Sequence, residues 1–268
     1  MPNPSRLTVH LLPSLIPPGA LRGGVAVVID VLRATSVMVQ ALASGCTQII
    51  PCLEIDDAKE VAAEFAPGSV ILGGERQGLP IDGFDLGNSP GDYTLEVCGG
   101  KTLVMTTTNG TRAILSSLEA DRILVASFAN LGATLEVLAK ELEHRPVHVV
   151  CAGTNGEVSL EDTLLAGEFL LRIAEKRQNL GHWSDVGKSL HCNDAAFLAA
   201  ATAWGLAAHR SSDGASTRLD VLSKGWGGRR VTELGLSPDI REAAGPREIR
   251  LIGQLARDPI RIVAVAPI

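Results

Sequence analysis

The sequence predicts an α/β fold, a three-layer α/β/α sandwich with a mainly parallel sheet, arranged as one large domain or two lobes. Short runs rich in Val and Ile recur along the 268 residues, and each leads through a turn into a longer segment of helical pattern, as in βαβ units. Hydrophobic residues make up 46% of the chain but aromatic residues only 3%. The core therefore depends on Ala, Val, Leu and Ile, which suits strands buried on both faces.

Strands are predicted where aliphatic and β-branched residues run together and end at a polar or glycine-rich cluster, at residues 25–29, 47–52, 69–72, 102–106, 122–127, 147–151 and 260–266. Helices are predicted where apolar residues recur at three- and four-residue intervals, at residues 32–43, 56–64, 111–118, 131–143, 160–175 and 193–206.

We expect a boundary between two regions of the chain where Gly181, His182 and Gly187 interrupt the helical pattern. Residues 1–176 hold the motifs of the candidate site. Residues 177–268 form a C-terminal α/β region, which is either a second lobe or part of the same domain. Within it, the polar and glycine-rich segment 210–228 is either a loop over the site or a connection.

Charge and cysteine content exclude several classes of function. The net charge of −6 and the pI of about 5.5 argue against nonspecific binding to nucleic acid or to an anionic membrane surface. Five cysteines without a C-x-x-C pair are expected in a reducing cytoplasm. The sequence shows neither a signal-peptide pattern nor a run of about 18 apolar residues, so we expect no membrane span. The expected partner is a small anionic substrate, and a homo-oligomer remains open.

Polar and charged residues follow four of the predicted strands, at the carboxyl ends where parallel α/β proteins bind ligands. Asp30 directly follows strand 25–29, with Arg33 and Ser36 shortly after it. Asp30 is a candidate metal-binding or nucleophilic carboxylate, and helix N-capping is an equally good interpretation. Arg33 either contacts a phosphoryl oxygen or pairs with Asp30. We assign Ser36 to substrate binding.

The second segment, residues 73–90, is rich in glycine and proline but also carries Glu75, Arg76, Asp85 and Asn88. Glycines make a loop entropically costly to order, so loops that only connect are rarely built this way. We assign Glu75 and Asp85 to metal binding, Arg76 to catalysis and Asn88 to substrate binding. A solvated charged loop is the alternative.

The third segment joins a predicted strand to a predicted helix. It consists of Thr107, Thr108, Asn109, Gly110, Thr111 and Arg112. Hydroxyl groups, free backbone N–H groups, the positive end of the helix dipole and a guanidinium group converge here, which predicts an anion-binding site. A simple N-cap role for Asn109 is compatible with that site.

The fourth segment carries Glu161 and Asp162 at the start of the helix after strand 147–151. Ser159 and Asp162 approximate a capping box, which explains one acid without any catalysis. Neighbouring carboxylates repel one another unless a cation lies among them. A cluster of these acids with those of the first two segments therefore predicts a hard metal ion, most simply Mg²⁺.

These segments resemble the 2-phosphosulfolactate phosphatase family. The matching stretches are VIDVLRATS from Val28, GGERQG from Gly73, GFDLGNSP from Gly83, TTTNGTRA from Thr106 and CAGTNGEVSLED from Cys151. Beyond residue 175 the likeness is confined to a helix containing Asp194 and to LGLSPDI from Leu234. The resemblance implies magnesium-dependent hydrolysis of (R)-2-phospho-3-sulfolactate to sulfolactate and phosphate, a step of coenzyme M biosynthesis.

Such a substrate carries a phosphate, a carboxylate and a sulfonate on three carbons, so an acidic protein needs local positive groups to bind it. We assign Asp30, Arg33, Arg76 and Arg112 to catalysis. The expected magnesium ligands are Asp30, Glu75 and one of Asp85, Glu161 or Asp162. Attack by water and attack by a carboxylate through a phospho-enzyme both remain open. A related magnesium phosphatase for another small phosphorylated acid and a non-catalytic anion-binding module are the alternative functions.

Overall fold

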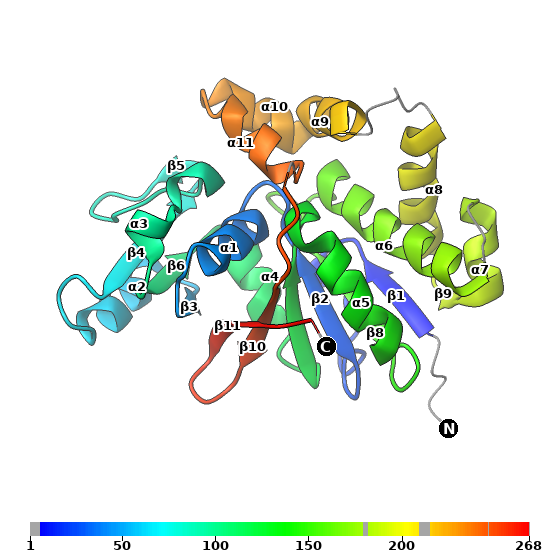
Figure 1. The fold of residues 1–268 in the computed structure, drawn as a ribbon, viewed down its shortest axis with the longest axis horizontal. Coiled ribbons are helices and arrows are strands. Elements are labelled where there is room, and N and C mark those ends of the chain that lie inside the picture. The colour runs from blue at the N-terminus through cyan, green and yellow to red at the C-terminus, as the bar shows by residue number, and fades with distance from the viewer. Residues whose placement is uncertain (1–5, 179–181, 209–214, 246, 268) are drawn as a thin grey trace.

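One sheet of eleven strands runs through the computed structural model, which describes residues 6–178, 182–208, 215–245 and 247–267 (Figure 1). The strands are β1 (Arg6–His10), β2 (Val25–Ile29), β3 (Gln48–Cys52), β4 (Val70–Arg76), β5 (Leu79–Pro80), β6 (Thr102–Thr106), β7 (Arg122–Ala126), β8 (Val147–Cys151), β9 (His191–Cys192), β10 (Ile252–Ala256) and β11 (Arg261–Val265). Their order across the sheet is β5-β4-β6-β3-β11-β10-β7-β2-β8-β1-β9.

Eleven α-helices accompany the sheet in the described part of the chain. They are α1 (Ala34–Ala43), α2 (Ile55–Ala63), α3 (Leu95–Cys98), α4 (Gly110–Ser116), α5 (Leu131–Glu141), α6 (Leu160–Gln178), α7 (Val186–Ser189), α8 (Asp194–Ala208), α9 (Ala215–Lys224), α10 (Trp226–Glu233) and α11 (Ser237–Ala243). Each predicted strand and helix has a counterpart among these elements. The sequence patterns did not predict β1, β5, β9, β10, α3, α7 or α9 to α11.

The sheet consists of two parallel blocks joined by an antiparallel hairpin. Strands β7, β2, β8, β1 and β9 pair in parallel, and so do β3, β6 and β4. Between the blocks, β10 pairs antiparallel with β7 and β11, and β11 pairs antiparallel with β3 through Ile262 and Ile49. The predicted α/β class with a mainly parallel sheet is confirmed, although its last predicted strand, β11, is antiparallel to its neighbours.

The carboxyl ends of the two blocks meet despite the reversal that the hairpin introduces. Because three successive pairings between the blocks are antiparallel, the strands of the second block run opposite to those of the first. Sheets twist by about 20 to 25° per pair of strands, and this twist accumulates over the five pairings between β2 and β6. Gly110, just after β6, packs against Asp30, just after β2. Residues from both blocks can therefore line one site.

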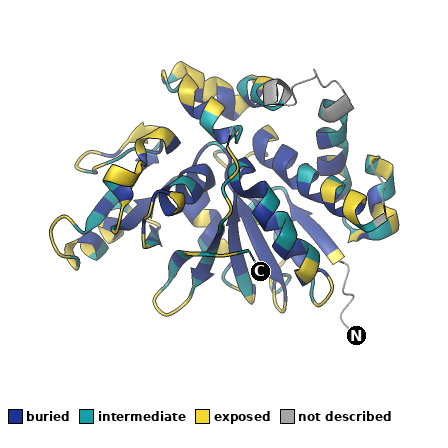
Figure 2. Ribbon diagram, viewed as in Figure 1, coloured by how far each residue is buried: buried dark blue, intermediate teal, exposed yellow. Residues whose placement is uncertain are grey.

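Helices cover both faces of the sheet, as a three-layer sandwich requires. The odd-numbered residues of β2 belong to one buried cluster with α5, α6 and α8, whereas its even-numbered residues belong to another with α1 and α4. In the second block, Leu103 and Met105 of β6 share the α1 and α4 cluster, while Val104 packs with Ala58 and Ala62 of α2. Figure 2 shows the strands as the buried centre of the molecule.

The region after residue 177 contributes to several parts of the fold. β9 extends the sheet beside β1, α8 packs along α6, and β10 and β11 occupy the middle of the sheet. Helices α9 to α11 lie together beyond the carboxyl ends of the strands, at the top of Figure 1. Of segment 210–228, residues 210–214 lie outside the described part, and most of the rest forms α9 and the start of α10. The boundary near residue 177 stays a prediction.

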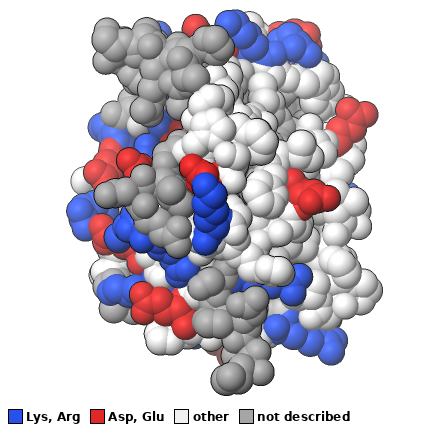
Figure 3. Space-filling model, turned by 90° about the vertical axis from the view of Figure 1, so that its right-hand side faces the viewer, with Lys and Arg blue, Asp and Glu red and all other residues white. Residues whose placement is uncertain are grey.

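The outer side over α7 and α8 combines charged and uncharged areas. Figure 3 shows basic and acidic side chains beside one another on this face, next to a large area without charge. Helix α8 carries a single charged residue, Asp194, and its Leu198 is 61% exposed. None of the described helices combines the length and the apolar character needed to cross a membrane.

Candidate active site

A cavity of about 540 Å³ lies beyond the carboxyl ends of β2, β4, β6 and β8, within the size range of small-molecule sites. The loops after these strands form one part of its wall, and α10 forms another. Six residues proposed from the sequence line it, namely Asp30, Arg33, Glu75, Asn88, Thr108 and Asn109.

Asp30 is the first residue after β2 and is almost fully buried. Its backbone N–H donates to Thr35 Oγ1 at 2.9 Å, and its Oδ1 accepts from the Ala34 N–H at 3.3 Å, so the carboxylate contacts the first turn of α1. A Cβ at Gly110 would lie 2.8 Å from Asp30 Oδ2 and 2.4 Å from the Ala34 side chain. Only glycine lets α4 approach Asp30 so closely.

Glu75, near the end of β4, ties the second segment to the third. Its Oε1 accepts from the Thr108 N–H at 2.7 Å, and its Oε2 accepts from the Gly78 N–H at 2.7 Å and from the Thr108 hydroxyl at 3.2 Å. Protein donors thus occupy both carboxylate oxygens. Glu75 fixes the loop after β6 against the turn after β4.

The two acids at the start of α6 lie behind the cavity wall. Asp162 Oδ1 accepts from the Val31 N–H at 2.8 Å, and its Oδ2 accepts from the Gly153 N–H at 3.1 Å. Glu161 is 1% exposed, and its Oε2 has no hydrogen-bond partner among the described residues. Helix α10 covers Glu161 so closely that a Cβ at Gly227 would lie 2.1 Å from Oε1.

Burial raises the pKa of Asp30, Glu161 and Asp162, and neighbouring carboxylates add to the effect on Asp30 and Glu161. Burial, together with the charges of Asp162 and Glu75, raises the pKa of Asp30 well above its ordinary value. Burial and the charge of Asp162 raise the pKa of Glu161 to about 7. Burial also raises the pKa of Asp162 to about 6, although its hydrogen bonds from the backbone oppose that change. Such a cluster favours bound protons or a bound cation.

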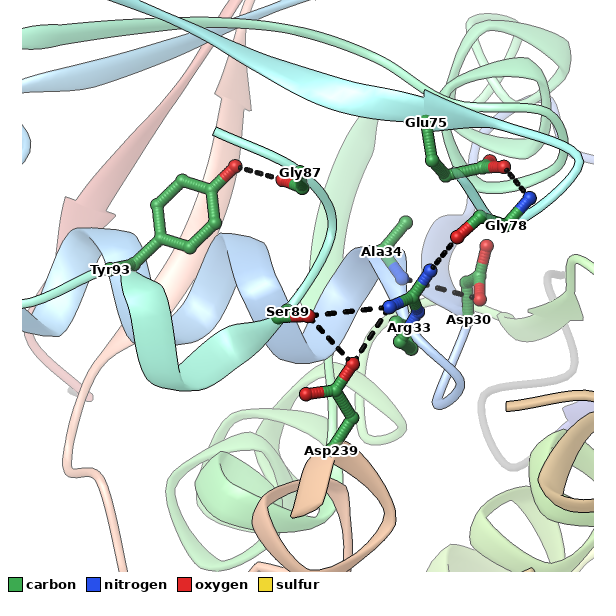
Figure 4. A network of polar contacts seen from close by, with 9 residues as sticks. All are labelled: Asp30, Arg33, Ala34, Glu75, Gly78, Gly87, Ser89, Tyr93 and Asp239. Carbon is green, nitrogen blue, oxygen red and sulfur yellow. Dashed lines mark hydrogen bonds and ion pairs between the residues drawn. The ribbon is translucent and has the colours of Figure 1, made fainter. Parts of the chain in front are cut away.

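Arg33 is held in place by a buried network of polar contacts (Figure 4). Its Nη1 donates to Asp239 Oδ2 of α11 at 2.7 Å and lies 3.4 Å from Ser89 Oγ, while its Nη2 donates to the Gly78 carbonyl at 2.8 Å. Ser89 also donates to Asp239 at 2.8 Å. Arg33 therefore pairs with Asp239, from the C-terminal region, and its charge is compensated in the protein.

The segment after β6 is ordered by its own side chains. Thr111 N–H donates to Thr107 Oγ1 at 3.1 Å, and Thr107 N–H donates to Thr111 Oγ1 at 3.2 Å, so these two buried threonines bind each other. Asn109 Oδ1 accepts from the Asn155 N–H at 3.1 Å, which connects this segment to the loop after β8. Thr108 and Asn109 line the cavity, and Thr107 and Thr111 support them.

Four other proposed residues lie outside the cavity lining. Arg76 donates to the Leu53 carbonyl at 2.7 Å and to Thr106 Oγ1 at 2.8 Å. Asp85 accepts from the Leu72 N–H at 2.8 Å, and Ser36 donates to the Val31 carbonyl at 2.8 Å. Arg112 is exposed on α4. The geometry gives these four no contact with a ligand in this cavity, and their assigned roles stay predictions without structural support.

The contribution of α10 and α11 was not predicted from the sequence. Trp226, Gly227, Arg230 and Glu233 line the cavity from the C-terminal region, and Asp239 binds Arg33. One signal was available, because the stretch LGLSPDI contains Asp239. No comparable signal marks Arg230.

The described residues offer few acidic ligands to a magnesium ion at this site. Among the residues that the structure describes, no three His, Cys, Asp or Glu side chains are placed to bind one metal ion. Mg²⁺, however, often uses one or two carboxylates and completes its shell with waters and substrate phosphate oxygens. Asp30 Oδ2 and Glu161 Oε2 accept no hydrogen bond from the described residues. Asp30 lines the cavity, whereas Glu161 is buried next to it under α10 and would bind the ion from that side.

A family model covers nearly the whole chain. The model described as 2-phosphosulpholactate phosphatase matches residues 10–257, a range that includes every residue lining the cavity. The chain belongs to the 2-phosphosulfolactate phosphatase family. The resemblance in its strand-end motifs is thereby confirmed.

Several curated proteins named "Probable 2-phosphosulfolactate phosphatase" are similar to this member of the 2-phosphosulfolactate phosphatase family. The one from Clostridium perfringens (strain SM101 / Type A) is 44% identical over 161 residues, which are 59% of this chain and 64% of that protein. The one from Caldicellulosiruptor saccharolyticus is 48% identical over 153 residues, 56% of this chain and 62% of that protein. The chain thus matches less than two thirds of the length of these two relatives.

Proposed function

We propose that this protein hydrolyses (R)-2-phospho-3-sulfolactate to sulfolactate and phosphate with Mg²⁺, in a step of the type used in coenzyme M biosynthesis. The family and the names of the relatives support a phosphatase acting on 2-phosphosulfolactate. The observation that carries the proposal is the cavity in which the buried Asp30 lies beside the ion-paired Arg33.

Asp30 and Glu161 are the residues that would hold the metal ion. Bound Mg²⁺ supplies charge neutralisation for the phosphoryl oxygens. The raised pKa of both acids supports this role, because a cation stabilises the ionised carboxylates that burial disfavours. Glu75 and Asp162 fix the loops around the site, since backbone donors engage their oxygens.

Arg33 positions the phosphate in this proposal. A guanidinium group has five N–H donors, and three contacts to Asp239, Ser89 and Gly78 engage part of that set. The remaining donors can bind a phosphoryl oxygen without rearrangement, because the protein already fixes the side chain. Thr108 and Asn109 add polar groups to the cavity lining.

A phosphate-release assay tests the proposal. Purified protein is incubated with 2-phosphosulfolactate in the presence of Mg²⁺, of EDTA, and of EDTA followed by excess Mg²⁺. Release is expected in the first and third samples only. Absence of release with Mg²⁺, despite measurable binding of the substrate, would favour the anion-binding module. A higher kcat/KM for another small phosphorylated acid would instead identify a related phosphatase.

A further inference from the structure

Helix α10 presents one continuous face to the cavity. Gly227, Arg230, Val231 and Leu234 all line it, and their spacing of three and four residues places them on the same side of the helix and its C-terminal end. Arg230 is thus the guanidinium group that the C-terminal helices bring to the site. It lies far along the chain from the motifs after β2, β4 and β6.

To bind a multiply charged anion, this cavity needs a positive group whose charge is not already neutralised by another residue of the protein. The lining contains the acids Asp30, Glu75 and Glu233 and the arginines Arg33 and Arg230. The proposed substrate carries a phosphate, a carboxylate and a sulfonate. An anion of this kind is repelled by uncompensated carboxylates, so its binding depends on each available cation.

Arg33 and Arg230 differ in how far other residues of the protein neutralise their charge. Arg33 is buried and forms an ion pair with Asp239 at 2.7 Å. Arg230 is 44% exposed at its side chain, and its Nη1 lies 3.6 Å from Glu233 Oε2, beyond ordinary hydrogen-bond length. Exposed pairs of this kind contribute little to stability. A ligand anion can therefore replace Glu233 at Arg230 with little loss.

We propose that Arg230 binds the sulfonate of the substrate and thereby determines specificity for a sulfonated phosphoacid. The inference rests on the proposed function and extends it to the non-reacting end of the substrate. Arg33 binds the phosphate beside the strand ends, and Arg230 receives the sulfonate on the α10 wall. The guanidinium fork suits an anion with several oxygens in fixed geometry.

The test compares two substrates in variants of α10. The substrates are 2-phosphosulfolactate and 2-phospholactate, in which a methyl group replaces the sulfomethyl group. Arg230→Gln should raise KM for the sulfonated substrate by at least about tenfold, equivalent to about 1.4 kcal/mol. It should leave KM for 2-phospholactate within about twofold. Arg230→Lys should recover part of the loss, because it keeps the charge but not the fork.

Two further variants on α10 serve as controls. One tests whether the position of the arginine matters, and the other tests whether removing a negative charge has the opposite effect on KM. Arg229→Gln removes the neighbouring arginine, which is exposed and donates to the Lys224 carbonyl at 2.5 Å, and should leave both KM values unchanged. Glu233→Gln removes the competing carboxylate and should lower KM for the sulfonated substrate by about two- to fivefold. Equal KM changes for both substrates in Arg230→Gln would overturn the inference, and so would no change for either.

Calorimetric binding of sulfolactate separates a failure of this inference from a failure of the proposed function. If the wild-type protein releases no phosphate but binds sulfolactate, and Arg230→Gln weakens that binding tenfold, the sulfonate site stands while the phosphatase proposal fails. If the wild-type protein hydrolyses 2-phosphosulfolactate and Arg230→Gln binds sulfolactate with unchanged affinity, the sulfonate site fails alone. If the wild-type protein does not bind sulfolactate, the inference is wrong.

Discussion

At the scale of single residues, Asp30 is the side chain on which burial and charge conflict most strongly. It is 6% exposed and lies near Asp162, Glu75 and Glu161, and these surroundings raise its pKa. A carboxyl group whose pKa is raised in the folded state is fully accommodated only while it is protonated. The stability that it contributes is therefore present at low pH and is lost as the pH rises through the folded-state pKa.

Asp30→Asn separates the proposed catalytic role of this side chain from its cost to stability. The amide keeps an oxygen for the Ala34 N–H but cannot ionise, so kcat should fall by about 100-fold or more. In EDTA the variant should unfold at a higher temperature than the wild type, and by a larger margin at pH 8 than at pH 5. Thermal unfolding at both pH values measures this. A variant that is less stable than the wild type at pH 8 would contradict the prediction.

Sequence motifs identified the residues at strand ends but not the direction in which each side chain points. Asp30, Glu75 and Thr108 lie within two residues of a strand end, so their place at the carboxyl edge follows from the strand itself. Arg112 lies in the first turn of α4, where the direction of a side chain depends on how the helix packs. The structure buries Thr111 and Ala113 and leaves Arg112 exposed. Periodicity alone does not fix that rotation.

At the scale of elements, the contact between Arg33 and Asp239 attaches the C-terminal helices to the site. The two residues are 206 positions apart, and their side chains are 4% and 7% exposed. Helix α11 carries Asp239, and α10, directly before it, forms the cavity wall. The loop after β2 and the C-terminal helices are therefore joined through one buried charge pair.

Asp239→Asn should destabilise the protein by about 3 to 5 kcal/mol, because it leaves the Arg33 guanidinium buried without a counter-charge. Urea unfolding measures the change. Glu119→Gln is the matched control, since it removes one member of an exposed pair with Arg22 and should cost about 1 kcal/mol or less. The double variant Arg33→Met, Asp239→Leu should regain most of the stability while remaining inactive. Equal effects of Asp239→Asn and Glu119→Gln would refute this role.

The C-terminal elements show where prediction from the sequence reached its limit. Residues 260–266 have the composition of a buried strand, and β11 does form there. Composition does not reveal that β10 and β11 form a hairpin between the two parallel blocks, because that placement depends on pairing with strands far away in the chain. Asp239 and Arg230 were missed for the same reason, since partners from distant segments give them their roles.

At the scale of the whole molecule, a buried histidine pair connects two strands of the first block. His10 Nε2 of β1 lies 3.2 Å from His148 Nδ1 of β8, and the rings are tilted by only 19°. Burial lowers the pKa of both rings, that of His148 to about 4, and the charge of His10 adds to the effect on His148. His148 Nε2 is buried without a partner. A proton there would find no acceptor.

The histidine pair should make the fold sensitive to acid. A lowered pKa in the folded state means that the unfolded chain binds protons first, so stability falls as the pH drops from about 6.5 toward 4. His148→Gln removes this titration and should reduce the loss between pH 7 and pH 4.5 by on the order of 1 to 3 kcal/mol. Urea unfolding at several pH values checks it. The carboxylates around Asp30, whose pKa is raised, change stability with pH in the opposite direction. Identical pH profiles of stability for the variant and the wild type would rule out the histidine pair as a cause of acid sensitivity.

The hairpin of β10 and β11 also bears on how the chain is made. Because synthesis starts at the N-terminus, a nascent chain that has emerged as far as residue 250 holds both parallel blocks but no strand to join them. β7 and β3 then expose open edges, which invite pairing with other nascent chains. The β10–β11 hairpin, which is made after both blocks, seals both edges at once, so protection from aggregation arrives only after Val265 has emerged.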